Sequence, residues 1–128
     1  PGPVLACLDA RMGEIYVAEY QRDARGELQQ LGESCVISPA DWQWQSTHGH
    51  ARGTGLSACE AVLAHRLQSQ GTWTLQADAL PHAADLACLA VARYQPALAV
   101  SIDAVQPIYL RDKVAQTLAE RGVPLPSV

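Results

Sequence analysis

The chain has 128 residues, of which 48% are hydrophobic and 17% are charged, and its formal net charge is −4. This length suits one domain with a real hydrophobic core, and this composition excludes a disordered chain. The negative charge argues against a stand-alone nucleic-acid-binding protein, because neutralising phosphates requires a basic surface, and no apolar run approaches the roughly 20 residues of a membrane span.

The first part of the chain predicts three consecutive strands. Residues 4–10 (VLACLDA) are apolar except for Asp9, as in a strand buried on both faces. Residues 14–21 (EIYVAEYQ) alternate, so that Ile15 and Tyr16 begin opposite faces, and residues 28–38 form a more polar strand. The turns RMGE and RDARGE each contain a glycine. Short turns between consecutive strands predict an antiparallel meander.

The rest of the chain predicts helices alternating with strands. A Ser-Pro pair favours a helix start, and Gly71 favours a helix end. The expected elements, in chain order, are a short helix begun by Ser38 and Pro39, a polar loop at 45–50, a strand at 51–55, a helix at 58–70 capped by Ser57, a strand at 73–77, a helix at 82–94 with Leu86, Leu89, Ala90 and Arg93 on one face, an extended piece through Leu110, a last helix, and a loose tail at 123–128.

This order predicts a mixed α/β sheet, an antiparallel meander followed by helix–strand alternation, as in ribonuclease-H-like domains. The four cysteines, Cys7, Cys35, Cys59 and Cys88, form no CxxC or other close pair. A zinc site is therefore not expected, and free reduced thiols in a cytoplasmic protein are.

Three segments resemble the second half of the bacterial TsaB (YeaZ) family: DARMGEIYVAEY at 9–20, GTG at 53–55 and PIYLRDKVA at 107–115. The resemblance implies a ribonuclease-H-like fold of the actin/Hsp70-type ATPase superfamily. It also implies that residues 1–128 are a single domain matching the C-terminal half of a two-domain protein. The Asp-Thr pair and the GPGSFTG-type loop of the family's first domain do not occur in this sequence.

The resemblance further implies a function. Family members support the transfer of a threonylcarbamoyl group to adenosine 37 of tRNA, together with the catalytic subunit TsaD and the ATPase TsaE. The implied role is a non-catalytic, cytoplasmic scaffold that forms complexes with TsaD-like and TsaE-like proteins and forms homodimers. No cofactor, no metal, no membrane and no direct binding of nucleic acid by this domain are expected.

The hairpin around residues 9–16 carries a charged cluster with two interpretations. The first is a metal-dependent hydrolase, in which Asp9 would converge with Asp41, Asp85 or Asp103. The second, favoured here, is a structural hairpin corner or interface in which Asp9 accepts backbone N–H groups and Arg11 pairs with Glu14 or a neighbouring carboxylate. This corner consists of Asp9, Arg11, Gly13, Glu14 and Tyr16.

Two smaller motifs also have alternatives. Gly53 and Gly55 form either a strand-to-helix turn, which is favoured, or a turn that faces a nucleotide. His48 and His50 are interpreted as solvated loop residues rather than metal ligands, because no third ligand lies close in sequence.

The glycoprotease-like or peptidase-like label of the family finds no support in the residues, since HExxH and GxSxG are both absent. Candidate partner contacts are Trp42, if its indole is exposed, and Tyr109 and Arg111, which are first interpreted as packing and salt-bridge residues.

Overall fold

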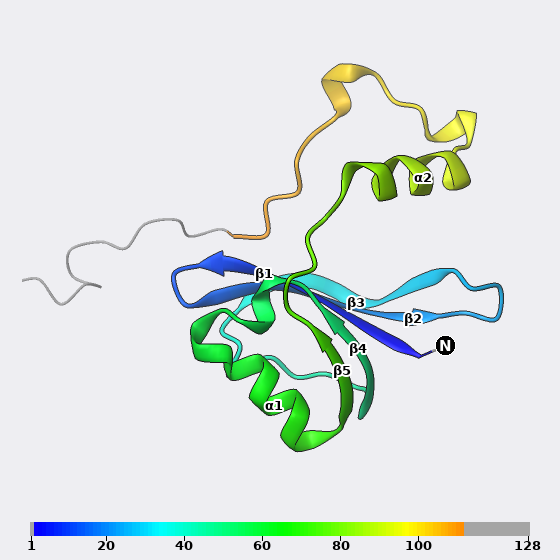
Figure 1. Ribbon diagram of the computed structural model, residues 1–128. Helices are drawn as coiled ribbons and strands as arrows, with labels where there is room; N and C mark the ends of the chain where they lie inside the picture. Colours follow the sequence, from blue (N-terminus) through cyan, green and yellow to red (C-terminus); the bar gives the residue numbers. More distant parts are fainter. Residues whose placement is uncertain (1, 112–128) are drawn as a thin grey trace, which may run out of the picture.

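The computed structural model describes residues 2–111 and has a five-stranded sheet with two α-helices (Figure 1). The strands are β1 (Pro3–Arg11), β2 (Glu14–Arg22), β3 (Leu28–Ile37), β4 (His48–Arg52) and β5 (Thr72–Gln76). The helices are α1 (Val62–Gln70) and α2 (Ala83–Arg93), and short 3-10 turns lie at Thr54–Leu56, Cys59–Ala61, Pro96–Leu98 and Ile102–Ala104.

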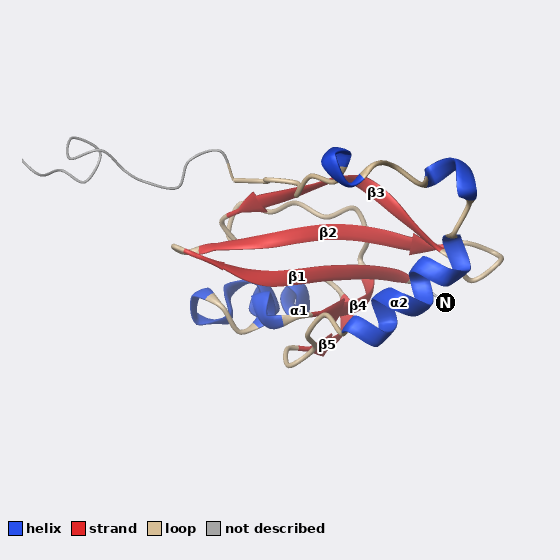
Figure 2. Cartoon of the chain, turned by 90° about the horizontal axis from the view of Figure 1, so that it is seen from above, coloured by secondary structure: helices blue, strands red, loops and turns tan. Residues whose placement is uncertain are grey.

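The strand order is β3-β2-β1-β4-β5, with β1, β2 and β3 antiparallel and β4 and β5 parallel to β1 (Figure 2). Parallel neighbours need a crossover connection, and α1 supplies it between β4 and β5. The predicted antiparallel meander is confirmed, and the predicted alternation of strands and helices is confirmed from β4 to α2.

The β1–β2 hairpin closes through a two-residue turn at Met12 and Gly13, which have φ angles of 57° and 78°. Positive φ at both central positions matches the twist of the flanking strands. Arg11, which precedes the turn, also has a positive φ of 64°. A glycine in the turn therefore reduces the number of strained residues at this corner.

The hydrophobic core lies between α1 and one face of the sheet. The side-chain alternation of β2 directs Ile15 and Val17 into this core, while Tyr16 lies on the other face, as the sequence predicted. From α1, Leu63 and Leu67 are fully buried. The core cluster comprises Leu5, Cys7, Ile15, Val17, Ala51, Leu56, Leu63, Leu67 and Trp73.

The predicted helix after Ser38 is wrong: the chain makes only a turn at residues 39–41. The Ser38 hydroxyl accepts a hydrogen bond from the Ala40 amide, so the start signal is used locally. The carbonyls of Pro39 and Trp42 accept hydrogen bonds from Nη1 of Arg66, which lies on α1. Contacts with α1 replace the hydrogen bonds that would have continued the helix.

The predicted loop at 45–50 is partly wrong, because His48-Gly49-His50 begins β4 and the strand ends at Arg52. Gly49 lets β4 fit in place, since a Cβ there would lie 2.4 Å from Pro3 O. Ser57 is also not a helix cap: its hydroxyl donates to Thr54 O, and α1 begins after Ala61, which has left-handed φ.

Helix α2 confirms the predicted helix at 82–94, and His82 caps it by accepting a hydrogen bond from the Ala84 amide at Nδ1 (3.3 Å). The face predicted to carry Leu86, Leu89, Ala90 and Arg93 is not covered within the described structure, since α2 has no buried residue. Figure 1 shows α2 standing off the face of the sheet opposite α1. The expected extended piece through Leu110 follows, whereas the expected last helix and the tail at 123–128 lie outside the described residues.

Among the described helices, none is both long and apolar enough to cross a membrane.

Candidate functional site

The hairpin corner is organised around Asp9. One carboxylate oxygen of Asp9 accepts a hydrogen bond from the Arg11 amide (2.8 Å), and the other lies 3.1 Å from the Arg11 guanidinium. The side chain of Arg11 is 86% exposed, so this ion pair contributes little stability. Asp9 therefore holds the turn, and Arg11 pairs with Asp9 rather than with Glu14.

Glu14 pairs instead with Arg111, a residue 97 positions away, at 2.5 Å. The guanidinium of Arg111 also donates to Ala10 O (2.9 Å) and Arg11 O (3.3 Å), and its side chain is only 14% exposed. These contacts attach residue 111 to the hairpin corner. The salt-bridge role of Arg111 was predicted from the sequence. Its partners were not, because they lie far away along the chain and leave no local sequence signal.

The turn at Thr54–Leu56 packs directly on β1. A Cβ at Gly53 would lie 1.9 Å from Cys7 O, and one at Gly55 would lie 3.0 Å from Cys7 C. The Thr54 hydroxyl accepts a hydrogen bond from the Asp9 amide (3.1 Å). Both glycines are buried and face the backbone of β1, so this geometry favours a strand-to-helix turn over a turn open to a nucleotide.

Cys7 lies under this turn and is 1% exposed. Burial raises the pKa of its thiol from the ordinary 9.0 to about 12, and a backbone hydrogen bond with Leu56 partly opposes the increase. Its Sγ donates to Arg52 O at 3.5 Å. A thiol held in the protonated form is a poor nucleophile, so Cys7 is a packing residue.

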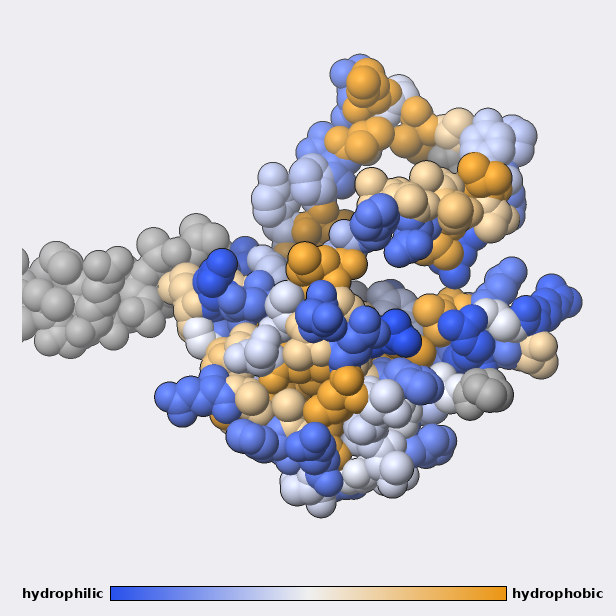
Figure 3. Space-filling view, viewed as in Figure 1, coloured by the Kyte–Doolittle hydropathy of each residue, from blue (hydrophilic) through white to orange (hydrophobic). Residues whose placement is uncertain are grey.

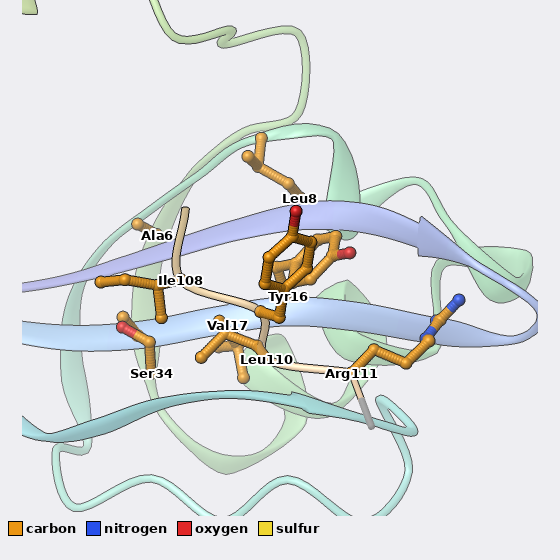
Figure 4. Close-up of a pocket in the computed structure, with 10 residues that line it drawn as sticks. Ala6, Leu8, Tyr16, Val17, Ser34, Ile108, Leu110 and Arg111 are labelled. Carbon is orange, nitrogen blue, oxygen red and sulfur yellow. The ribbon is translucent and has the colours of Figure 1, made fainter. Parts of the chain in front are cut away.

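A pocket of about 430 Å³ lies between the outer face of the sheet and residues 108–111 (Figure 4). Tyr16, which is 38% exposed, lines it together with Leu8 and Ser34. On the other side lie Ile108, which is 87% exposed, and Tyr109, which is 80% exposed. Tyr16 and Tyr109 thus share one pocket, and within residues 2–111 the Tyr109 side chain, unlike that of Arg111, makes no hydrogen bond.

The tryptophans lie in or against the core, and none of the three is exposed. Trp42 and Trp44 are half-buried against the core cluster, and Trp73 is 9% exposed. The guanidinium of Arg66 lies 4.9 Å from the ring centroid of Trp44. All three indole rings are therefore packing residues, although Nε1 of Trp42 and Nε1 of Trp73 are buried without a hydrogen-bond partner among the described residues.

The carboxylates proposed for a hydrolase do not gather in the part of the chain that the structure describes. Residues 2–111 contain no group of three His, Cys, Asp or Glu side chains arranged to hold a metal ion. Asp41 follows β3, Asp85 lies on α2, and Asp103 lies in the turn at Ile102–Ala104. The described geometry gives the hydrolase alternative no support.

The feature that the sequence analysis missed is the arm, defined as residues 80–111. Ten of the twelve exposed large apolar side chains of the described residues belong to it: Leu80, Leu86, Leu89, Val91, Tyr94, Val100, Ile102, Val105, Ile108 and Tyr109. Figure 3 shows apolar colour on α2 and on the loop that follows it. A signal was present, because α2 (AADLACLAVAR) is apolar nearly all round, which is typical of a helix covered on more than one side.

No family model matches the sequence. The chain is 30% identical, over 130 aligned residues, to the tRNA threonylcarbamoyladenosine biosynthesis protein TsaB of Escherichia coli (strain K12), covering 88% of this chain and 49% of that protein. The chain therefore spans about half the length of the curated relative that it matches.

Two solved structures are similar. YeaZ from Pseudomonas aeruginosa superposes with a TM-score of 0.62 at 31% identity, covering 84% of this chain and 49% of that one. A structure described as an uncharacterized protein with similarity to peptidase YEAZ from Pseudomonas aeruginosa has a TM-score of 0.63 at 32% identity, covering 85% and 49%. The chain is a homologue of TsaB (YeaZ) with the ribonuclease-H-like fold. The predicted resemblance to TsaB and the predicted fold class are confirmed.

Proposed function

We propose that this TsaB homologue is a non-catalytic scaffold domain in tRNA threonylcarbamoyladenosine synthesis. Its residues 1–128 correspond to the C-terminal half of a two-domain protein. It acts in the cytoplasm by forming a complex with TsaD-like and TsaE-like proteins, and the partners hold the tRNA. In this role it contributes a folded surface rather than a nucleophile or a base.

The observation that carries this proposal is the arm. A stable sheet and helix α1 bury their own apolar residues, yet Leu86 (69% exposed), Val91 (80%) and Ile102 (86%) remain open to solvent on an ordered segment. Contiguous exposed apolar surface is typical of a protein–protein interface. In this proposal the arm is the docking surface for another folded protein, which is what a scaffold needs.

The attachment of Arg111 to the hairpin corner supports the same role. It attaches the far end of the arm to Glu14 and to the backbone of β1. Tyr109, next to this anchor, is 80% exposed and lines the pocket beside Tyr16. We therefore propose Tyr109 as a partner contact and Arg111 as its support, and Trp42 only as packing.

The test is capture of the TsaD-like protein of the source organism by the tagged 128-residue chain. We expect the double variant L86E/V91E to reduce capture at least about tenfold, because buried charge is strongly unfavourable at an interface. The matched control Q68E/Q70E adds the same charge to exposed positions of α1 and should capture normally.

No capture by the unchanged chain, or equal loss in both variants, would contradict the proposal. Analytical ultracentrifugation of the isolated chain over a range of concentrations shows whether it forms a homodimer. Self-association that L86E/V91E abolishes would show that a second copy can occupy the arm.

A further inference from the structure

The geometry points to a binding site for a phosphate ester between α2 and the outer face of the sheet. The pocket there has a volume of about 660 Å³, within the usual range of small-molecule sites, which is roughly 300–1,000 Å³. Figure 3 shows the molecule hollowed between α2 and the sheet, and Figure 2 shows α2 crossing above the sheet near the start of β1. This pocket is separate from the hairpin corner and from the pocket at Tyr109.

The sheet register brings three cationic or hydrogen-bond-donating side chains to this pocket. His50 lies beside Val4 and Arg52 lies beside Ala6 in the β1–β4 pairing, so both side chains share one face of β4. Arg22, the last residue of β2, lines the pocket from the other side of β1. Two strands thus contribute the three groups, Arg22 from β2 and both His50 and Arg52 from β4.

The local charge is positive although the chain is negative overall. Asp85, on the first turn of α2, is the one carboxylate among the pocket-lining residues. Within the described residues, neither Arg22 nor Arg52 forms a salt bridge. The guanidinium of Arg22 donates to Gly26 O through Nη1, which orients it and leaves its other donors free. Unpaired arginines of this kind suit a phosphate group, which they bind through paired hydrogen bonds.

The remaining lining residues decide the class of ligand. Val4, Leu28 and Leu89 give the pocket apolar walls, which fit an apolar or aromatic body attached to the phosphate. A long polyanion is disfavoured, because it needs an extended basic surface and the net charge of the chain is −4. The ligand that fits is a small organic phosphate ester. This inference is independent of the proposed scaffold role.

The experiment is a ¹H–¹⁵N NMR titration of the full 128-residue chain with phenyl phosphate, with phenol as the probe that lacks phosphate and inorganic phosphate as the probe that lacks the apolar body. We expect saturable shifts at the amides of Gly2, Val4 and residues 50–52, tighter binding of phenyl phosphate than of inorganic phosphate, and no saturable shift with phenol.

Four variants test the charges. R52Q should weaken the binding of phenyl phosphate about tenfold, because a charge-assisted hydrogen bond is lost. D85N should tighten it, because the opposing carboxylate is removed. R25Q and D78N make the same charge changes at exposed positions outside the pocket and should leave the affinity within about twofold, as screened surface charges do.

Three results would overturn the inference. They are no saturable shift up to about 10 mM phenyl phosphate, which would nearly saturate a site with a Kd of about 1 mM, equal weakening in R52Q and R25Q, or unchanged affinity in D85N. Arg52 and Asp85 are exposed and make no side-chain hydrogen bond in the described structure, so both variants should fold, and their amide spectra verify this directly.

Discussion

The sheet with α1 and the arm use apolar residues in opposite ways. In the sheet and α1, Leu5, Ile15 and Leu63 are completely buried, whereas in the arm Leu86 and Val91 are largely exposed. Both regions contain regular secondary structure, and both helices show a clear local helix pattern. The difference teaches that a helix pattern specifies the helix, while burial depends on which surface lies opposite it.

The largest expected contrast comes from the same substitution in each region. Leu63→Ala should lower the free energy of unfolding by about 2–5 kcal/mol, because it leaves a cavity in the core. Leu86→Ala should change it by about 0.5 kcal/mol or less, because the side chain is exposed. Urea unfolding followed by tryptophan fluorescence measures both, and equal losses would show that the arm packs as tightly as the core.

A second contrast concerns the glycine of the buried turn. Gly53→Ala should destabilise the protein by about 2–4 kcal/mol, because its φ is 121° and the new Cβ would collide with Cys7 O. Gly26→Ala has a φ of 85° but nothing within 4 Å, so about 1 kcal/mol is expected from backbone strain alone. Thermal unfolding of the two variants gives the difference, and the reverse order would refute the close approach of the turn to β1.

The attachment between the two regions should have a smaller effect. Arg111→Gln removes the Glu14 pair and weakens two bonds to backbone carbonyls, at a cost of about 1–2 kcal/mol at a partly exposed site. Hydrogen exchange of the amides at 10–14 should become about tenfold faster. Arg93→Gln, which loses one 3.3 Å bond to Leu28 O, is the control and should leave those amides unchanged.

Ionisation of Cys7 should have the smallest effect on the stability of the protein at neutral pH. Its pKa is about 12 in the folded state and ordinarily 9.0, so the folded protein keeps a proton that the unfolded chain loses above pH 9. Stability from this group is complete below about pH 9 and falls as the pH rises toward 12. The unfolding midpoint should therefore decline in this window, and less so in Cys7→Ala. Equal declines in both proteins would assign the change to other groups.

Thiol chemistry separates the regions in the same way. Cys88 on α2 is exposed and Cys7 is buried. Alkylation at pH 8 followed by peptide mass mapping should modify Cys88 first and leave Cys7 unmodified until the protein unfolds.

The sequence was sufficient for several parts of this protein. Alternation in β2, the apolar run of β1 and the glycine turns determined the meander, because these signals act between near neighbours. The helix at 83–93 followed from its own periodicity. The TsaB resemblance came from short segments whose matches extend over most of the chain.

Tertiary structure decided the rest, because the deciding contacts join residues far apart in sequence. Arg66 takes the carbonyls of Pro39 and Trp42 and so prevents the helix that Ser38 signals. Pairing with β5 along its length, and with β1 from His50 onward, makes the polar His48–His50 segment part of a strand. Arg111 reaches Glu14 across 97 residues, and α2 stays uncovered because the core is completed by α1 on the opposite face. Local sequence determined the elements, and long-range packing decided their ends, their partners and their exposed surfaces.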